Sequence, residues 1–227
     1  MSEPSDRPAQ GGTITKLTAQ KNNPDRVSVF VDGEFAFGVH QDLVLEHRLH
    51  AGRELSAAEW QTIVEDDRVA KAKARAFDYL AHKPRTVTEV RRKLREKDYP
   101  DPIIETVIER LHELNYLDDA HYAEQYVARR FSHKGYGPVR IRQELRKRGI
   151  DRPLAESAVE DFFEDESTLE AAREKAEKRW PRIAREDDAR KRRDKLYRYL
   201  KRRGYTYDTI RVVIDEMEAQ HEEAQHE

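Results

Sequence analysis

The sequence predicts a mainly α-helical protein, in which tandem three-helix repeats form an elongated, curved body behind a small N-terminal domain that contains a β-hairpin. The apolar pattern has a period of two before residue 56 and of about 3.6 after it. One segment of the helical part recurs three times without gaps. Charged residues make up 39% of the chain and apolar residues 37%, a composition that favours thin elements burying one stripe each over a single thick core.

Residues 12–55 are expected to form the small strand-rich domain. The stretch RVSVFVDGEFAFGV alternates apolar and polar residues around Asp32-Gly33, a pair that supplies the positive φ angles of a tight hairpin turn. The stretch TITKLTAQ before it predicts a third strand, and a short helix near residues 41–50 would cover the apolar face. Residues 1–11 are expected to be a disordered lead.

Capping residues divide the rest of the chain into helices. Ser56 and Glu59 have capping-box spacing at the start of a long helix that reaches about His82, and Thr86 with Glu89 starts the next. Prolines and cap residues predict further starts at these positions: Asp101, Asp118, Pro138, Asp151, 165–167 and 206–208. The three repeats are therefore expected at 56–117, 118–164 and 165–218, followed by an acidic tail at 219–227.

The repeated segment starts at Leu94, Leu145 and Leu200, where the sequence reads LREKDYPDPIIETVIERL, LRKRGIDRPLAESAVEDF and LKRRGYTYDTIRVVIDEM. Each copy begins with leucine and a basic patch, passes a turn, and enters a helix with apolar residues at matching places. The turn residue is glycine in the last two copies and Asp98 in the first, and aspartate is among the few residues that accept the left-handed conformation. Each repeat is expected to hold a leading helix, a basic helix and an apolar-striped closing helix.

Two further stretches, YLDDAHYAEQYV at residues 116–127 and KGYGPVRIRQELRKRGI at residues 134–150, complete a resemblance. Together with RRKLREKDYPDPIIETVIERL before them, they resemble the RecX family, bacterial regulators of the RecA recombinase. The resemblance covers roughly residues 70–218. It implies a modulator of RecA, usually an inhibitor, made of tandem three-helix repeats that bind along the groove of the RecA–DNA filament and regulate recombination and repair.

The positive charge is concentrated, although the net charge is only −2. Residues 171–203 carry +9, from 15 basic and 6 acidic residues, whereas residues 204–227 carry −6, from 1 basic and 7 acidic residues. Basic blocks favour polyanions or acidic protein surfaces, and the acidic tail is expected to screen this block while no partner is bound.

The candidate contacts to the partner, and to single- or double-stranded DNA, lie on the basic helix of each repeat and in the loop before the second. They are Arg91, Arg92, Arg95, Lys97, Lys134, Tyr136, Arg140, Arg142, Arg146, Lys147, Arg148, Arg190, Lys191, Arg192, Arg193, Lys195, Arg198 and Arg202. The competing interpretation of each is a solvated cation on a helix face. For the loop, a helix stop and restart with Tyr136 packed between helices is favoured over a loop that presents Lys134 and Tyr136.

The sequence predicts no enzyme, no metal site and no cofactor. Cysteine is absent, and neither a His-Glu-x-x-His motif nor a glycine-rich phosphate loop occurs. The pair Asp118-Asp119 is interpreted as a helix cap. No apolar stretch approaches the ~20 residues of a membrane span, and the N-terminus lacks the apolar segment of a signal peptide, so we expect a cytoplasmic monomer without membrane contacts.

Two other functions stay open at this point. A short helix, a turn and a basic helix are also the parts of a stand-alone helix-turn-helix DNA-binding protein. A passive helical scaffold without a link to the filament is the weaker option.

Overall fold

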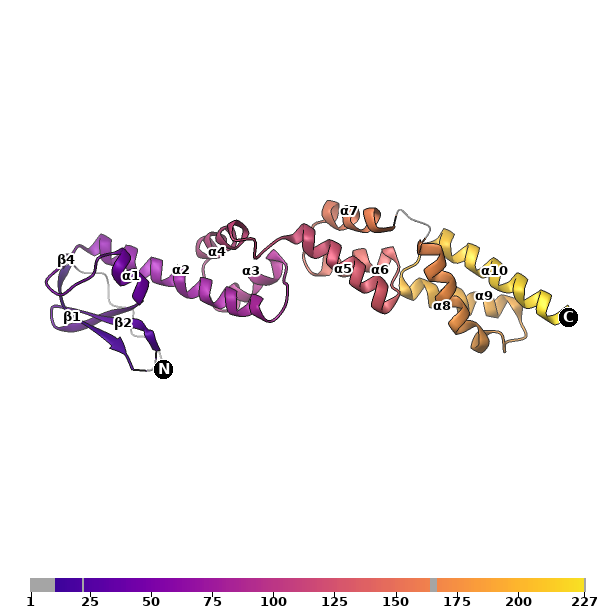
Figure 1. Ribbon diagram of the computed structural model, residues 1–227, viewed down its shortest axis with the longest axis horizontal. Coiled ribbons are helices and arrows are strands. Elements are labelled where there is room, and N and C mark those ends of the chain that lie inside the picture. The colour runs from indigo at the N-terminus through magenta and orange to yellow at the C-terminus, as the bar shows by residue number, and fades with distance from the viewer. Residues whose placement is uncertain (1–10, 22, 164–166, 227) are drawn as a thin grey trace. The chain divides into compact units, whose positions relative to one another are not determined.

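The structure, a computed structural model, describes residues 11–21, 23–163 and 167–226, and within them the chain is mainly helical (Figure 1). The strands are β1 Gly12–Gln20, β2 Asn23–Val31, β3 Glu34–His40 and β4 Glu54–Leu55. The helices are α1 Gln41–Glu46, α2 Ala57–Ala81, α3 Val87–Arg95, α4 Asp101–Glu113, α5 Asp119–Lys134, α6 Pro138–Lys147, α7 Arg152–Phe163, α8 Ser167–Ile183, α9 Ala189–Arg203 and α10 Tyr207–His226. The predicted fold class is confirmed: strands come first, and three successive helical trios follow.

The predicted boundaries are met to different degrees. The expected disordered lead lies outside the described residues except for Gly11, and so does most of the helix start expected at 165–167. The helix expected at 41–50 ends at Glu46, and β4 is an addition, because two residues give no periodic signal. Residues 219–226 continue α10 and are helical, so the segment expected to be a tail is the last two turns of a helix.

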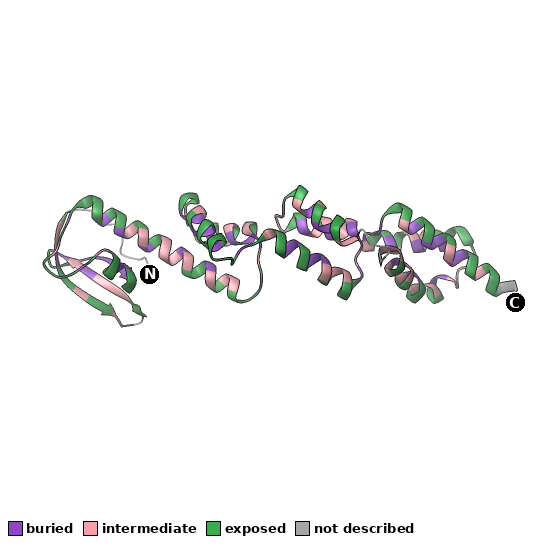
Figure 2. Cartoon of the chain, turned by 45° about the horizontal axis from the view of Figure 1, so that its top comes forward, coloured by how far each residue is buried: buried purple, intermediate pink, exposed green. Residues whose placement is uncertain are grey.

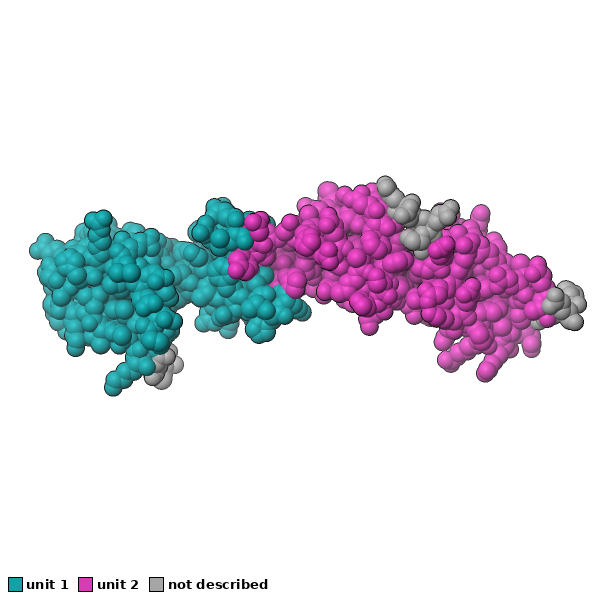
Figure 3. Space-filling model, viewed as in Figure 1, with its two compact units in different colours: residues 1–83, 91–114 teal, residues 84–90, 115–227 magenta. Residues whose placement is uncertain are grey.

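The described chain divides into two compact units, drawn in different colours in Figure 3. Unit 1 holds Met1–Lys83 and Arg91–Leu114, and unit 2 holds Pro84–Val90 and Asn115–Glu227. The boundary passes through α3, whose first residues belong with the second trio. None of the helices in the described residues combines the length and the apolar character that a bilayer crossing requires.

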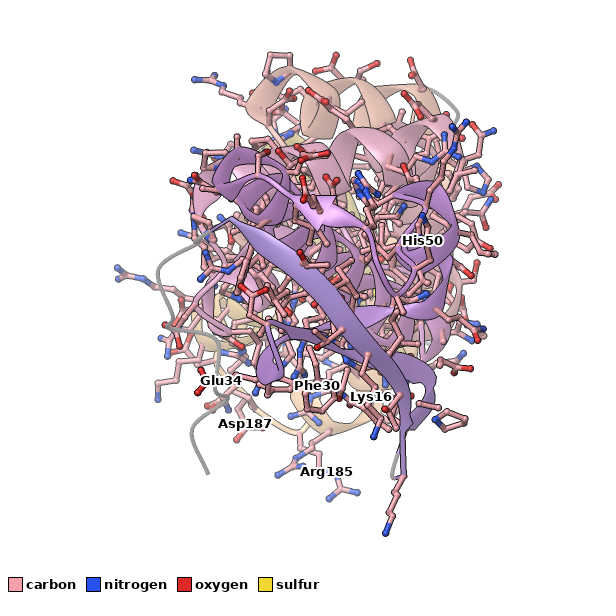
Figure 4. All side chains as sticks on the ribbon, turned by 90° about the vertical axis from the view of Figure 1, so that its left-hand side faces the viewer. Lys16, Phe30, Glu34, His50, Arg185 and Asp187 are labelled. Carbon is pink, nitrogen blue, oxygen red and sulfur yellow. The ribbon has the colours of Figure 1, made fainter. Side chains whose placement is uncertain are left out.

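Unit 1 is built on a four-stranded antiparallel sheet with the strand order β3-β2-β1-β4. Asp32 and Gly33 have φ angles of 49° and 86°, so the predicted β2–β3 hairpin turn is confirmed. One face of the sheet is buried, and the ring centroids of Phe37 and Trp60 lie 5.1 Å apart where α2 packs on it. Figure 4 labels Lys16 and Phe30 on the neighbouring strands β1 and β2, where the ammonium lies 5.9 Å from the ring centroid.

The long helix α2 begins with the predicted capping box. The Ser56 hydroxyl accepts from the Glu59 amide at 3.2 Å, and the Glu59 carboxylate accepts from the Ser56 amide at 2.8 Å. The Glu59 carboxylate also accepts from the Ser56 hydroxyl at 2.8 Å and from Arg53 at 2.9 Å. The three bonds to the carboxylate lower the pKa of Glu59 from 4.5 to about 2, the backbone amide of Ser56 being the largest cause.

A pH effect on unit 1 follows from this cap. Because the pKa of Glu59 is lower in the folded chain, its stabilisation is complete above about pH 4.5 and is lost as the pH falls towards about 2. We expect the Glu59→Gln variant to lose less stability than the parent chain over this interval. Urea unfolding at several pH values, followed by Trp60 fluorescence in a Trp180→Phe background, measures the difference. Parallel stability profiles of the two chains would contradict the expectation.

Unit 2 contains two three-helix cores that follow the same order. In the second trio α6 contributes Ile141 and Leu145, and in the third trio α9 contributes Leu196 and Leu200, all four fully buried. Figure 2 shows these helices with buried residues on one side and exposed residues on the other, the amphipathic pattern that the sequence predicts.

The turn after the basic helix is left-handed in all three trios, as predicted. The φ angles are 61° at Asp98, 85° at Gly149 and 89° at Gly204. At each turn the following residue donates its amide to the leucine that begins the repeat, to Leu94, Leu145 and Leu200 respectively. The aligned positions of the sequence are therefore equivalent in the structure.

Candidate polyanion-binding surface

The basic helices α6 and α9 meet end to end within unit 2. The Gly137 amide donates to the Arg203 carbonyl at 2.8 Å, and the Val139 amide donates to the Gly204 carbonyl at 3.0 Å. The first amides of a helix and its last carbonyls have no partner inside the helix. Here the amides of one helix pair with the carbonyls of the other, so the two basic helices are held as one continuous element.

Glycine is required on both sides of this junction. A Cβ atom on Gly137 would lie 2.5 Å from the carbonyl oxygen of Gly204. A Cβ atom on Gly204 would lie 2.4 Å from the amide nitrogen of Arg140, and its φ of 89° already disfavours a side chain. The close approach of two backbones therefore explains two of the glycines in the repeated segment and the loop before it.

An equivalent junction joins α3 to the end of α6. The hydroxyl of Thr86 donates to the Arg148 carbonyl at 2.7 Å, and the hydroxyl of Thr88 donates to the Gly149 carbonyl at 3.2 Å. These two carbonyls occupy the positions in the repeat that accept the amides at the α6–α9 junction. Because the start of α3 is held here, residues 84–90 belong to unit 2.

A polar network in the second trio links its two junctions. The Arg148 guanidinium donates to Glu89 at 2.8 Å and lies 5.1 Å from the centroid of the Tyr126 ring. The Tyr126 hydroxyl donates to Glu144 at 2.7 Å, and Glu144 also accepts from Arg140 at 3.2 Å. Burial raises the pKa of Glu144, but these two hydrogen bonds and the charges of Arg130 and Arg140 outweigh it and leave the pKa below its usual range.

The loop before α6 has the geometry of the favoured interpretation, a helix stop and restart with Tyr136 packed against the core. Gly135 ends α5 with a φ of 58°. The carbonyl of Lys134 accepts from the Arg203 guanidinium at 2.9 Å. Tyr136 is half-buried against the core of the second trio, with the Arg140 guanidinium 3.8 Å from its ring centroid. The side chain of Lys134 is exposed.

Many of the candidate cations already pair with carboxylates of the same chain. Arg91 forms a bidentate contact with Glu105 at 2.8 and 2.9 Å, and Arg95 contacts Asp101 at 2.9 Å. Weaker contacts of 3.9 Å join Arg92 to Glu96 and Lys191 to Glu186. No ion pair within the described residues engages the following candidates: Lys97, Lys134, Arg142, Arg146, Lys147, Arg190 and Arg202. These are the cations with charge to offer a partner.

Arg192 is buried inside the third trio. This corrects the prediction that it contacts a partner, which requires an exposed side chain. Its side chain is 8% exposed and contacts Glu218, itself 7% exposed, at 2.7 Å. It also donates to the carbonyls of Glu186 and Asp187 at 3.0 and 3.1 Å, which fixes the turn before α9. All of its donors face inward, so the structure gives Arg192 a stabilising role.

Carboxylates of α10, within the acidic segment 204–227 that is expected to screen the basic block, pair with cations of the third trio. Arg193 of α9 contacts Asp215 of α10 at 2.5 Å, and Arg173 of α8 contacts Glu216 of α10 at 2.6 Å. With Glu218, these carboxylates come from the third and fourth turns of α10. Other cations of the basic segment pair with Glu174, Glu186 and Asp194 inside the segment, so α10 supplies only part of the neutralisation among the described residues.

A cleft between α8 and α9 is lined by five cations. Its volume is about 350 Å³, and its lining includes Lys195, Arg198 and Arg202 from α9. Arg179 and Arg182 of α8 line the opposite side, and neither is among the sequence candidates. Their three-residue spacing indicates one helix face, but only the packing of α8 on α9 brings the two rows together.

Asp119 caps a different helix from the one that the sequence predicts. Asp118 caps α5 by accepting from the His121 amide at 2.9 Å, which confirms the capping interpretation of the pair. The carboxylate of Asp119 instead accepts from the Val87 amide at 3.0 Å and so caps α3. No local signal predicts this, because the two residues are 32 positions apart.

The chain was compared with known proteins. The regulatory protein RecX of Clostridium acetobutylicum is 38% identical to it over 207 residues, which are 90% of this chain and 96% of the relative. The chain belongs to the RecX family. Four RecX family models match in order: the N-terminal domain of regulatory protein RecX at residues 12–56, then the first, second and third three-helix domains at 72–111, 118–159 and 165–214. Each matched region falls on the sheet or on one helical trio.

Other RecX proteins agree in sequence and in fold. The regulatory protein RecX of Bacillus subtilis is 33% identical over 212 residues, which are 92% of this chain and 79% of that protein. A crystal structure of regulatory protein RecX has a TM-score of 0.75 at 31% identity and covers 90% of this chain and 99% of its own. RecX from Lactobacillus salivarius has a TM-score of 0.63 at 32% identity, with 68% and 99% covered.

Proposed function

We propose that this chain inhibits the RecA recombinase by binding the RecA–DNA filament through the basic helices of its three repeats, and so regulates DNA recombination and repair in the cytoplasm. Membership of the RecX family supports RecA as the partner. The observation that carries the mode of binding is the end-to-end junction of α6 and α9, because it holds the cations of the second and third repeats in a fixed register. A repeating row of cations suits a partner that also repeats along its length.

The exposed cations of the basic helices that pair with no carboxylate of the described residues are the proposed contacts. Arg146 and Lys147 lie in the last turn of α6 and pair with no carboxylate among the described residues. Arg190, at the start of α9, likewise pairs with no carboxylate among the described residues. Exposed ion pairs contribute little to stability, so the paired cations, such as Arg95, can also exchange an intramolecular carboxylate for one on the partner. The contacts are individually weak and their sum sensitive to salt.

The alternative of a stand-alone helix-turn-helix reader has less support. Such proteins read base edges with the N-terminal residues of the second helix. In this chain the first turn of α6 is bonded to Arg203 and Gly204, and the first turn of α3 meets Arg148 and Gly149. Two of the three candidate recognition helices therefore have their reading ends covered. Sequence-selective binding to a duplex in a mobility-shift titration would favour the alternative.

Inhibition of RecA is tested by its ATP hydrolysis on single-stranded DNA. We expect the chain to reduce the rate at well below one molecule per recombinase, and the Arg146→Ala/Lys147→Ala variant to require roughly tenfold more protein, since each lost charge contact weakens binding. Lys16→Ala/Lys21→Ala removes the same charge from exposed positions of unit 1 and serves as the matched control. An unchanged rate with the parent chain, or equal effects of the two variants, would count against the proposal.

A further inference from the structure

The cleft between α8 and α9 is lined by two facing rows of cations. Arg179 and Arg182 stand three residues apart on α8, and Lys195, Arg198 and Arg202 stand three and four residues apart on α9. Such spacings place each row on one side of its helix. Its volume of about 350 Å³ lies within the range of small-molecule sites, near the lower end.

The described lining residues of this cleft include no carboxylate. Two of the cations do have acidic neighbours, because Lys195 contacts Glu186 at 2.6 Å and Arg198 contacts Asp194. The Arg198 contact is exposed and the Lys195 contact is exposed on the lysine side, with Glu186 24% exposed, so both can be exchanged for a contact with a ligand. No ion pair among the described residues engages Arg182 or Arg202. The positive charge of this lining, which ion pairs of the described residues offset only at Lys195 and Arg198, favours the entry of an anion.

One cation of the cleft is held in place by an aromatic ring. The Arg179 guanidinium lies 5.6 Å from the centroid of the Tyr199 ring, and Tyr199 itself lines the cleft. The cation–π contact restricts a long side chain before any ligand binds. Ile183, which is buried, forms an apolar floor. A partly preorganised site loses less entropy on binding than free side chains would lose.

We propose that this cleft binds the phosphoryl groups of nucleotide units, with Arg182 and Arg202 as the principal contacts. The proposal deepens the proposed function, on which it rests for the nature of the ligand, because it names the part of the filament that the third repeat would meet. Four of the five cations are arginines, whose planar forks suit the oxygens of a phosphate bidentately. The phosphoryl group comes either from a DNA strand or from a free nucleotide.

Fluorescence anisotropy with a labelled single-stranded dT20 oligonucleotide tests the site without RecA. We expect Arg182→Ala/Arg202→Ala to weaken binding about tenfold or more and to reduce the salt slope by about 1.4, from about 0.7 for each lost single-strand phosphate contact. The matched control is Arg185→Ala/Lys201→Ala, which removes two exposed cations of the third repeat outside the cleft. This control is expected to change the affinity less than threefold.

Competition by ATP separates the two sources of phosphate. Displacement of dT20 at micromolar ATP, lost in Arg182→Ala/Arg202→Ala, supports a free-nucleotide site, and displacement only by unlabelled DNA supports a strand site. Equal losses in both variants, or equally effective competition by poly-glutamate, would show that bulk charge and not a phosphate site is at work. RecA inhibition is measured in parallel: if it persists while dT20 binding is absent, the cleft assignment fails and the proposed function stands.

Discussion

Gly204→Ala is expected to destabilise unit 2 by about 2–5 kcal/mol and to separate the third repeat from the second. About 1–3 kcal/mol comes from a side chain at a φ of 89°, and a similar amount from overpacking against the backbone of Arg140, 2.4 Å from the new Cβ. Differential scanning calorimetry of the full chain measures the loss as a lower transition temperature. The variant is also expected to inhibit RecA poorly, because α6 and α9 no longer share a register.

Two further glycine variants separate backbone strain from the steric clash. Gly33 has a φ of 86°, but a Cβ atom there would meet no atom within 4 Å, so Gly33→Ala introduces strain without a clash and is expected to cost about 1 kcal/mol. Gly137 has a φ of −83° but would meet the Gly204 carbonyl at 2.5 Å, so Gly137→Ala introduces the clash alone. If Gly137→Ala unfolds like the parent chain, the junction does not hold the repeats together.

Arg192→Met is expected to destabilise the third repeat by about 3 kcal/mol. Removing one partner of a buried pair leaves the other charge without compensation, here the carboxylate of Glu218. The carbonyls of Glu186 and Asp187 also lose a donor. The double variant Arg192→Met/Glu218→Met is expected to recover most of the loss, because two apolar side chains of similar size replace the pair. Chemical denaturation of the four chains of this cycle measures the coupling.

The outcome of that cycle also bears on function. A double variant that folds well and still inhibits RecA would agree with a stabilising role for Arg192. A double variant that is stable but does not inhibit RecA would indicate that Arg192 contacts the partner, and would contradict a purely stabilising role.

The repeated segment predicts the turns of the basic helices because their chemistry is local. A left-handed residue after a helix demands glycine or a substitute such as Asp98, and the alignment shows where. The difference between Asp98 and the two glycines depends on tertiary structure. At Gly149 and Gly204 the first residues of another helix pack against the turn and leave no space for a side chain. Residues 97–100 instead line a cleft of about 800 Å³ in unit 1, so the side chain of Asp98 has room.

The role of single arginines is harder to predict from basic composition. Arg192 lies four residues before Leu196 and eight before Leu200, which is the buried face of α9, so helical periodicity does contain the signal. Charge counting hides it, because the neighbouring residues are also basic. Arg179 and Arg182 are not predicted because they lie on a leading helix and not on a basic helix. They face the cations of α9 only through the packing of α8 on α9.

The most direct test of the account is a pull-down with the purified chain against three targets at equal concentration: RecA–DNA filaments, free RecA and free single-stranded DNA. The account predicts that filaments are retained at least tenfold better than either component, and that Gly204→Ala loses this preference while any binding to free DNA is reduced less. Retention of free DNA as strong as that of filaments, or a Gly204→Ala chain that is folded yet keeps the full preference, would contradict the claim that joined basic helices recognise the assembled filament.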